Sequence, residues 1–175
     1  MVTTDDWKEF FSPTPVGLVV VADGGYVNVG PGTWIQKVSY NPPIVMVSRK
    51  LGSDTDRLLS RRLPFVLSMP PLGWEEDVLQ CSRPVPYGES ELALPQVGFA
   101  IGCREGDRVF LEPMISHAVC SVVDPIVTIG DHRVFFAEVT ELRDGTEPRH
   151  PHNTMLHHKS KVFAAVGPLR LCAGW

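Results

Sequence analysis

Apolar residues along the chain occur in short runs that glycine, proline and other turn-forming residues interrupt. Residues 16–22 form an unbroken run of mainly β-branched side chains, which predicts a buried strand. Asp23-Gly24-Gly25 then predicts a turn, and residues 26–29 the returning strand. The first part of the chain is therefore predicted to form a β-hairpin.

Similar runs predict further strands over residues 44–48, 65–69, 118–123, 126–129 and 134–142. Pro42-Pro43 marks the beginning of the first of these, because proline cannot take part in a central ladder. Helices are predicted only as short connectors, over residues 74–81 and after Ser53, which with the acid three residues later forms a capping-box pattern. Residues 82–106 are interpreted as mainly loop, and the polar segment from about residue 144 as a mobile tail.

Short strands joined by short helices predict a mainly β fold. We expect a closed or nearly closed antiparallel barrel, since closure removes exposed sheet edges. The chain has 175 residues, which is within the usual size of one domain, and its sequence contains no internal repeat or linker. Residues 1–175 are therefore expected to form a single domain.

Composition and charge exclude several classes of protein. Apolar residues make up 43% and charged residues 21%, close to the globular average, so neither a disordered nor a fibrous protein is indicated. The net charge of -4 gives no general attraction to nucleic acid or to an anionic membrane. The N-terminus does not resemble a signal peptide, and the longest apolar run is too short to span a bilayer. We expect a cytoplasmic protein without a nucleic-acid or membrane partner.

Cysteine and histidine patterns do not predict a metal site. The cysteines are far apart and form no CxxC pair, so we expect reduced thiols, with Cys120 in the core. A histidine-rich tract surrounds Pro151 and consists of His150, His152, His157 and His158. Such a tract could bind a transition metal or haem, but a solvated terminal segment is the alternative that its spacing favours.

Two neighbouring segments carry the candidate chemistry. Residues 28–39 run N-V-G-P-G-T-W-I-Q-K-V-S, where glycine permits close approach of a ligand and Trp34 offers a flat face. Residues 48–55 run S-R-K-L-G-S-D-T, which places two cations and three hydroxyls before a predicted helix N-terminus. This arrangement favours an anion such as a phosphate. An ordinary capped helix beside solvated cations is an equally good interpretation of the second segment alone.

Four motifs of the sequence, and the order in which they occur, resemble those of a known family. They are P-V-G-L-V-V-V-A-D, N-V-G-P-G-T-W, V-S-Y-N-P-P-I-V-M-V-S and I-G-D-H-R-V-F-F-A-E-V. From about Pro15 to Leu142 the chain resembles the flavin reductase-like family of FMN-binding split barrels. The resemblance implies a split β-barrel, Greek-key-like and antiparallel, with short connecting helices. It also implies a homodimer with flavin at the subunit interface.

The resemblance also implies a set of flavin-binding positions. They are Gly32, Thr33 and Trp34, then Ser39, Tyr40 and Asn41, then Ser48, Arg49, Lys50, Ser53 and Thr55. His132 matches a histidine near the nicotinamide in related reductases, although a surface histidine beside a turn is the alternative. No catalytic residue is implied, because the flavin carries the redox chemistry and the protein binds and orients it. The expected cofactor is FMN, with FAD as the alternative, and the expected reductant is NADH or NADPH.

The function expected from the resemblance is a flavin-dependent oxidoreductase, an NAD(P)H:flavin reductase that supplies a monooxygenase. One alternative is an FMN-binding electron carrier without NAD(P)H activity. Another is an enzyme of specialised metabolism that uses the same pocket, since residues 84–113 match the family poorly and a fold does not determine chemistry. We expect His117 to be packed or capping, and Trp7 and Tyr87 either to cover a ring bound by the partner subunit or to fill an interface core.

Overall fold

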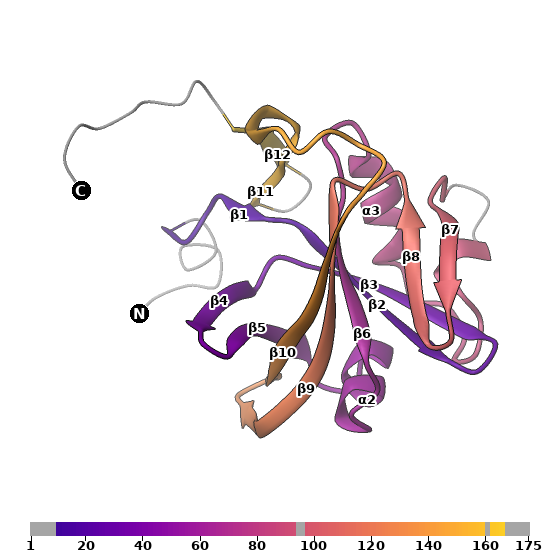
Figure 1. Cartoon of the computed structure of the whole chain (residues 1–175), viewed down its shortest axis with the longest axis vertical. Coiled ribbons are helices and arrows are strands. Elements are labelled where there is room, and N and C mark those ends of the chain that lie inside the picture. The colour runs from indigo at the N-terminus through magenta and orange to yellow at the C-terminus, as the bar shows by residue number, and fades with distance from the viewer. Residues whose placement is uncertain (1–9, 94–96, 160–161, 167–175) are drawn as a thin grey trace.

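The computed structural model describes residues 10–93, 97–159 and 162–166 (Figure 1). Its main element is a seven-stranded antiparallel sheet in the order β3-β2-β6-β9-β10-β5-β4. The strands are β2 (Gly17–Asp23), β3 (Tyr26–Gly32), β4 (Ile35–Tyr40), β5 (Pro43–Lys50), β6 (Phe65–Met69), β9 (Ser116–Ile129) and β10 (His132–Asp144). The expected mainly β, antiparallel fold is confirmed.

Two smaller sheets and two short helices complete the described part of the chain. One sheet has the order β1-β11-β12 and consists of β1 (Thr14–Pro15), β11 (Met155–Lys159) and β12 (Val162–Ala165). The other is a hairpin of β7 (Ala100–Glu105) and β8 (Arg108–Glu112). The helices are α2 (Asp54–Ser60) and α3 (Glu75–Cys81), and 3-10 turns occur at Glu91–Ala93 and Pro151–Asn153. None of the helices in the described residues is long and apolar enough to cross a membrane.

The core has two parts because both faces of the sheet are covered around β2. Leu18 and Val20 belong to one buried cluster, which includes residues of α3, β8 and β9. Val19 and Val21 belong to the other, which includes residues of α2, β5 and β10. Successive side chains of a strand point to opposite faces, so a strand that is buried on both sides is apolar throughout. This explains the unbroken run at residues 16–22.

The strand predicted over residues 118–123 and the one over 126–129 are a single strand in the structure. β9 continues through both, and its pairing with β10 shifts where Phe135 faces Ile126 while Phe136 faces Val123. Asp124-Pro125 therefore lies in a β-bulge. Proline has no N–H for the ladder and is tolerated at such a bulge, which is why it did not end the strand.

The expectation of loop over residues 82–106 was partly wrong. β7 lies inside this segment and pairs with β8, which the sequence analysis did not predict. All six residues of β7 are exposed, so no apolar alternation marks the strand. In β8, Val109, Phe110 and Leu111 are buried, but this run is too short to be distinguished from other apolar triplets.

The polar segment after residue 144 contains two strands, β11 and β12. β11 pairs with both β1 and β12, and Met155 is buried in the main core. The polar residues of β11 hid this strand, since Met155 and Leu156 are followed by His157, His158 and Lys159. β11 and β12 were not predicted from the sequence, and the mobility expected for this segment stays a prediction.

α2 begins at the predicted position. Ser53 is the N-cap, and its Oγ accepts a hydrogen bond from Asp56 N at 3.2 Å. The Asp56 side chain does not return to the cap residue but accepts from Gly52 N at 2.9 Å. The helix packs against the core through Leu58 and Leu59, so its N-terminus stays beside the end of β5.

Candidate functional site

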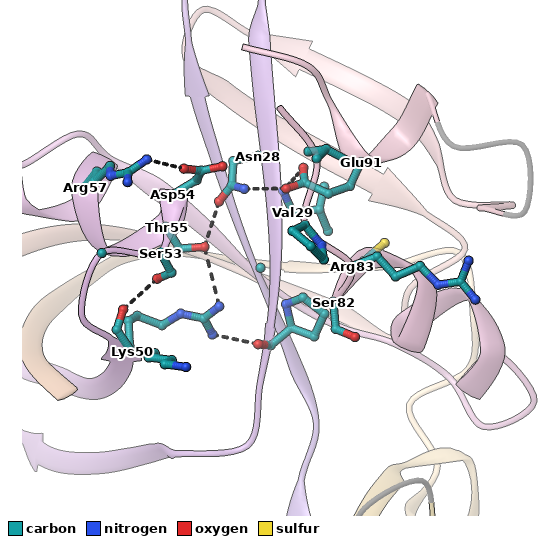
Figure 2. A pocket seen from close by; sticks show the side chains of 17 residues that line it. Asn28, Val29, Lys50, Ser53, Asp54, Thr55, Arg57, Ser82, Arg83 and Glu91 are labelled. Atoms are coloured by element: carbon teal, nitrogen blue, oxygen red, sulfur yellow. Dashed lines mark hydrogen bonds and ion pairs between the residues drawn. The ribbon is translucent and has the colours of Figure 1, made fainter. Parts of the chain in front are cut away.

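The loop at the end of β3, the end of β5 and the start of α2 meet around two adjoining cavities. The large cavity has a volume of about 530 Å³ and includes Asn28, Ser53, Thr55, Ser82 and Glu91 in its lining (Figure 2). The small cavity, of about 220 Å³, is lined by Pro31, Gly32, Thr33, Trp34, Ser48, Arg49, Lys50 and His132. Pro31, Arg49 and Lys50 line both. The two cavities therefore meet at a pair of cationic side chains.

Arg49 lies directly against the backbone of β3. Its Nη1 donates to Pro31 O at 2.7 Å, and its Nη2 lies 3.4 Å from Thr55 Oγ1. This approach requires glycine, because a Cβ at Gly30 would overlap Thr55 Oγ1 and one at Gly32 would lie 2.5 Å from Arg49 Nη1. The sequence pattern with glycine at both positions therefore allows an arginine side chain to pack beneath the loop.

The charge of Arg49 has no acidic partner at ion-pair distance among the described residues. Burial lowers the pKa of Arg49 to about 10, although the nearby Asp56 opposes this shift. Its Nε is buried and has no hydrogen-bond partner in the part of the chain that the structure describes. Since buried charges are normally paired, this donor set fits an anionic group such as a flavin phosphate.

A buried chain of hydrogen bonds connects the large cavity to Arg49 (Figure 2). Asn28 Nδ2 donates to Glu91 Oε1 at 2.6 Å, and Val29 N donates to Glu91 Oε2 at 2.9 Å. Thr55 Oγ1 donates to Asn28 Oδ1 at 2.7 Å. Asn28, Thr55 and Glu91 are all buried. Burial raises the pKa of Glu91, and the hydrogen bonds from Val29 and Asn28 oppose that increase.

The hydroxyl protons of Ser53 and Thr55 are used inside the protein. Ser53 Oγ donates to Lys50 O at 2.8 Å, and Thr55 donates to Asn28 as described above. In this arrangement neither hydroxyl can donate a proton to a ligand at the same time. Arg49 and Lys50 are therefore the donors that the described structure offers to an anion where the cavities meet.

Trp34 and His132 form one wall of the small cavity. Their ring centroids are 4.5 Å apart and the planes are tilted by 36°. His132 is opposite Lys50 in the pairing of β10 with β5, which explains how residues far apart in sequence become neighbours. The His132 Nδ1 lies 2.7 Å from Asp131 Oδ1, so this carboxylate can fix the orientation of the imidazole.

The structure brings most of the expected flavin-binding residues together, but not all. Ser39, Tyr40 and Asn41 lie at the end of β4 and in the turn to β5, and they line neither of the two cavities. Tyr40 is 87% exposed. The position of these three residues at an outer edge of the sheet is where a second subunit could reach them.

Sequence reasoning missed Asn28 and Glu91 as functional candidates. Asn28 stands at the start of the glycine-containing segment, so its inclusion could have been inferred from that position. Glu91 comes from the segment interpreted as loop, and nothing in the local pattern marks it as buried. Its role depends on a contact with β3 across 63 residues of chain, which only the tertiary structure reveals.

The other residues considered in the sequence lie outside this site, except Cys81. His117 is packed, as expected: its Nδ1 lies 2.9 Å from Ser68 Oγ, and burial lowers its pKa to about 4. His152 Nδ1 lies 2.7 Å from Val166 O. Cys120 is buried in the core as expected, and Cys81 lines the large cavity. Cys172 and Trp7 lie outside the described residues, whereas the exposed Tyr87 packs against Tyr26 with ring centroids 5.6 Å apart.

Comparison with known proteins identifies the family. The model of the flavin reductase like domain matches residues 10–165, which is most of the chain. The chain belongs to the flavin reductase-like family. The expected family is thus confirmed, and with it the general class of flavin-dependent oxidoreductases. The match covers both cavities, includes β7 and β8, where residues 84–113 match the motifs poorly, and extends to β11, which lies beyond the motif resemblance.

Solved structures of this family type share the fold at low sequence identity. A nitrilotriacetate monooxygenase component B from Bacillus cereus aligns with a TM-score of 0.81 at 16% identity, covering 98% of this chain and 95% of that one. An FMN-binding protein from Thermus thermophilus with bound p-hydroxybenzaldehyde aligns with a TM-score of 0.79 at 20% identity, covering 94% of this chain and 92% of that one. An NADH:FAD oxidoreductase from Streptomyces globisporus C-1027, in complex with NAD and FAD fragments, aligns with a TM-score of 0.74 at 20% identity. The alignment covers 96% of this chain and 97% of that one.

Proposed function

We propose that this protein is an NAD(P)H:flavin oxidoreductase that reduces FMN, with FAD as the alternative flavin. The observation that carries the proposal is the cationic junction formed by Arg49 and Lys50, which have no ion-pair partner among the residues described, between a small cavity with aromatic walls and a larger polar cavity. A flavin nucleotide has the matching chemistry, since it joins a planar ring to an anionic phosphate. When bound, the flavin supplies the redox chemistry, and the protein binds and orients it.

In this proposal the residues have separate tasks. Trp34, Thr33 and Gly32 line the ring side, whereas Arg49 and Lys50 hold the phosphate. Ser48, Ser53 and Thr55 shape the surrounding wall. His132, oriented by Asp131, borders the side from which NADH or NADPH reaches the ring.

The assembly proposed is a cytoplasmic homodimer that completes each flavin site from the second subunit. Ser39, Tyr40 and Asn41 then contact the flavin of the partner subunit. Exposed apolar residues on and beside the edge strand β4 support this, with Val38 at 47% and Tyr40 at 87% exposure. The likeness to a monooxygenase component B supports a monooxygenase as the acceptor of reduced flavin.

Steady-state oxidation of NADH and of NADPH, each with added FMN or FAD, tests the proposal. We expect oxidation of at least one reductant that depends on both protein and flavin. Correctly folded protein that binds flavin but oxidises neither reductant would instead identify an FMN-binding electron carrier. The contact of Trp34 with His132 favours this second candidate, because it covers one side of the imidazole.

A further inference from the structure

We propose that Glu91 is a positioning residue for the nucleotide site, which acts on the bound phosphate through Asn28, Thr55 and Arg49. This inference rests on the proposed function for its ligand, but the geometry that carries it is present in the protein alone. Glu91 stands in a 3-10 turn that is distant in sequence from the other three residues, which lie in β3 (Asn28), β5 (Arg49) and α2 (Thr55).

The direction of hydrogen bonding begins at the carboxylate. An ionised carboxylate only accepts, so Asn28 must turn its amide nitrogen toward Glu91, and Val29 N occupies the second oxygen. The Asn28 amide oxygen then points to Thr55 and takes its hydroxyl proton at 2.7 Å. Glu91 therefore selects one of the two possible orientations of the Asn28 side-chain amide.

The consequence reaches Arg49. Because the Thr55 proton is committed to Asn28, the lone pairs of Oγ1 face Arg49 Nη2, which can only donate. The other terminal nitrogen donates to Pro31 O at 2.7 Å. The guanidinium is thus held between two acceptors where the two cavities meet. A preorganised donor binds a phosphate more tightly than a mobile one, since less ordering is needed on binding.

Glu91→Gln reverses this direction with little change in shape. The Gln amide oxygen still accepts from Val29 N, while its nitrogen donates to Asn28 and turns the Asn28 amide around. Asn28 then donates to Thr55, and the Thr55 hydroxyl proton points toward Arg49. Two donors facing each other release the guanidinium from this contact. The substitution is therefore predicted to act at Arg49 although the two side chains do not touch.

A double-mutant cycle with Thr55 tests the proposal. FMN and riboflavin affinities are measured by fluorescence quenching for the wild type, Glu91→Gln, Thr55→Val and the double variant. We expect each single variant to weaken FMN binding about tenfold and to leave riboflavin, which has no phosphate, unchanged. The double variant should be no weaker than Thr55→Val alone, because coupled residues are not additive. Glu89→Gln, at an exposed position that lines neither cavity, is the matched control and should bind FMN like the wild type.

Two outcomes would overturn the proposal. One is unchanged or tighter FMN binding by Glu91→Gln, which would mean that the carboxylate only repels the phosphate. The other is simple addition of the two effects in the double variant, which would mean that they act independently.

The Arg49 Nε–H signal in a nitrogen–proton NMR spectrum provides a test without flavin. In the wild type we expect a resolved signal of a rigid guanidinium, and in Glu91→Gln a signal broadened or lost. An identical signal in both proteins would refute the positioning role. The two proteins could show this difference in the NMR signal while the wild type binds no FMN. That result would refute the proposed function and leave the positioning role of Glu91 supported.

Discussion

At the scale of single residues, the site depends on an arginine whose guanidinium is held by acceptors of the protein. Arg49 has two such acceptors and a buried Nε that has none. A lysine could supply the charge but not the planar set of donors. The glycines of β3 matter for the same reason, because they allow the guanidinium to approach the backbone.

Arg49→Lys should weaken FMN binding by about tenfold or more, since bidentate and charge-assisted hydrogen bonds are lost while the charge remains. Riboflavin binding should change much less. Equilibrium titration with both ligands measures the difference. Arg61→Lys is the control, because Arg61 is exposed and pairs with Asp23 outside either cavity. Equal loss of both ligands in Arg49→Lys would show that Arg49 supports the fold and not the phosphate.

Gly30→Ala should destabilise the protein by about 1–3 kcal/mol, as expected for overpacking at a tight contact. The new methyl group would overlap Thr55 Oγ1 and lie 2.5 Å from Arg49 Nη2. Gly25→Ala is the matched control, since a Cβ there would meet nothing within 4 Å. Urea unfolding of both variants gives the comparison. Equal stability of the two would contradict the close packing of Arg49 beneath β3.

At the scale of elements, strands with a clear pattern of apolar residues could be predicted from the sequence. Strands without such a pattern, which form by pairing with a neighbouring strand, could not. β2 could be identified because burial on both faces makes it apolar throughout. β7 is exposed along its length, and β11 has only two apolar residues, Met155 and Leu156, so neither has a period that sequence reasoning could detect. The same holds for the site: Arg49 follows from its local motif, whereas Glu91 follows from a distant contact.

The pairing of β6 with β9 predicts a pH dependence of stability. Register places Ser68 opposite His117, and burial, with a smaller effect of Arg143, lowers the pKa of His117 from 6.5 to about 4. Between these values the unfolded chain binds a proton that the folded protein does not. The free energy of unfolding is therefore expected to decrease by about 1–3 kcal/mol as the pH falls from 6.5 toward 4.

Urea unfolding at several pH values checks this effect. His117→Asn, which does not titrate, should flatten the decrease in stability between pH 6.5 and 4. His150→Gln, at an exposed position, is the control and should leave it unchanged. A decrease of the same size in His117→Asn and the wild type would mean that other groups cause it.

At the scale of the whole molecule, the proposed flavin site is completed by a second subunit. β4 is at the end of the seven-stranded sheet, and it carries exposed apolar side chains at Val38 and Tyr40. An exposed apolar edge is normally covered in a stable protein. A single chain also leaves Ser39, Tyr40 and Asn41 outside both cavities.

Val38→Asp should weaken the dimer by at least about tenfold, because it would bury a charge without a partner. Flavin affinity should decrease with the fraction of dimer. Sedimentation equilibrium over a range of concentrations measures the first effect. Ile101→Asp, on the exposed strand β7, should leave the dimer intact. A wild-type protein that is monomeric at all concentrations would contradict this part of the account.

The most direct test of the central claim is the visible absorption spectrum of the protein with FMN, recorded without oxygen before and after NADH or NADPH. The account predicts that binding shifts the flavin spectrum, that one reductant bleaches the oxidised band, and that oxygen restores it. Folded protein that leaves the spectrum of added FMN unchanged, and does not accelerate its reduction by either reductant, would contradict the claim.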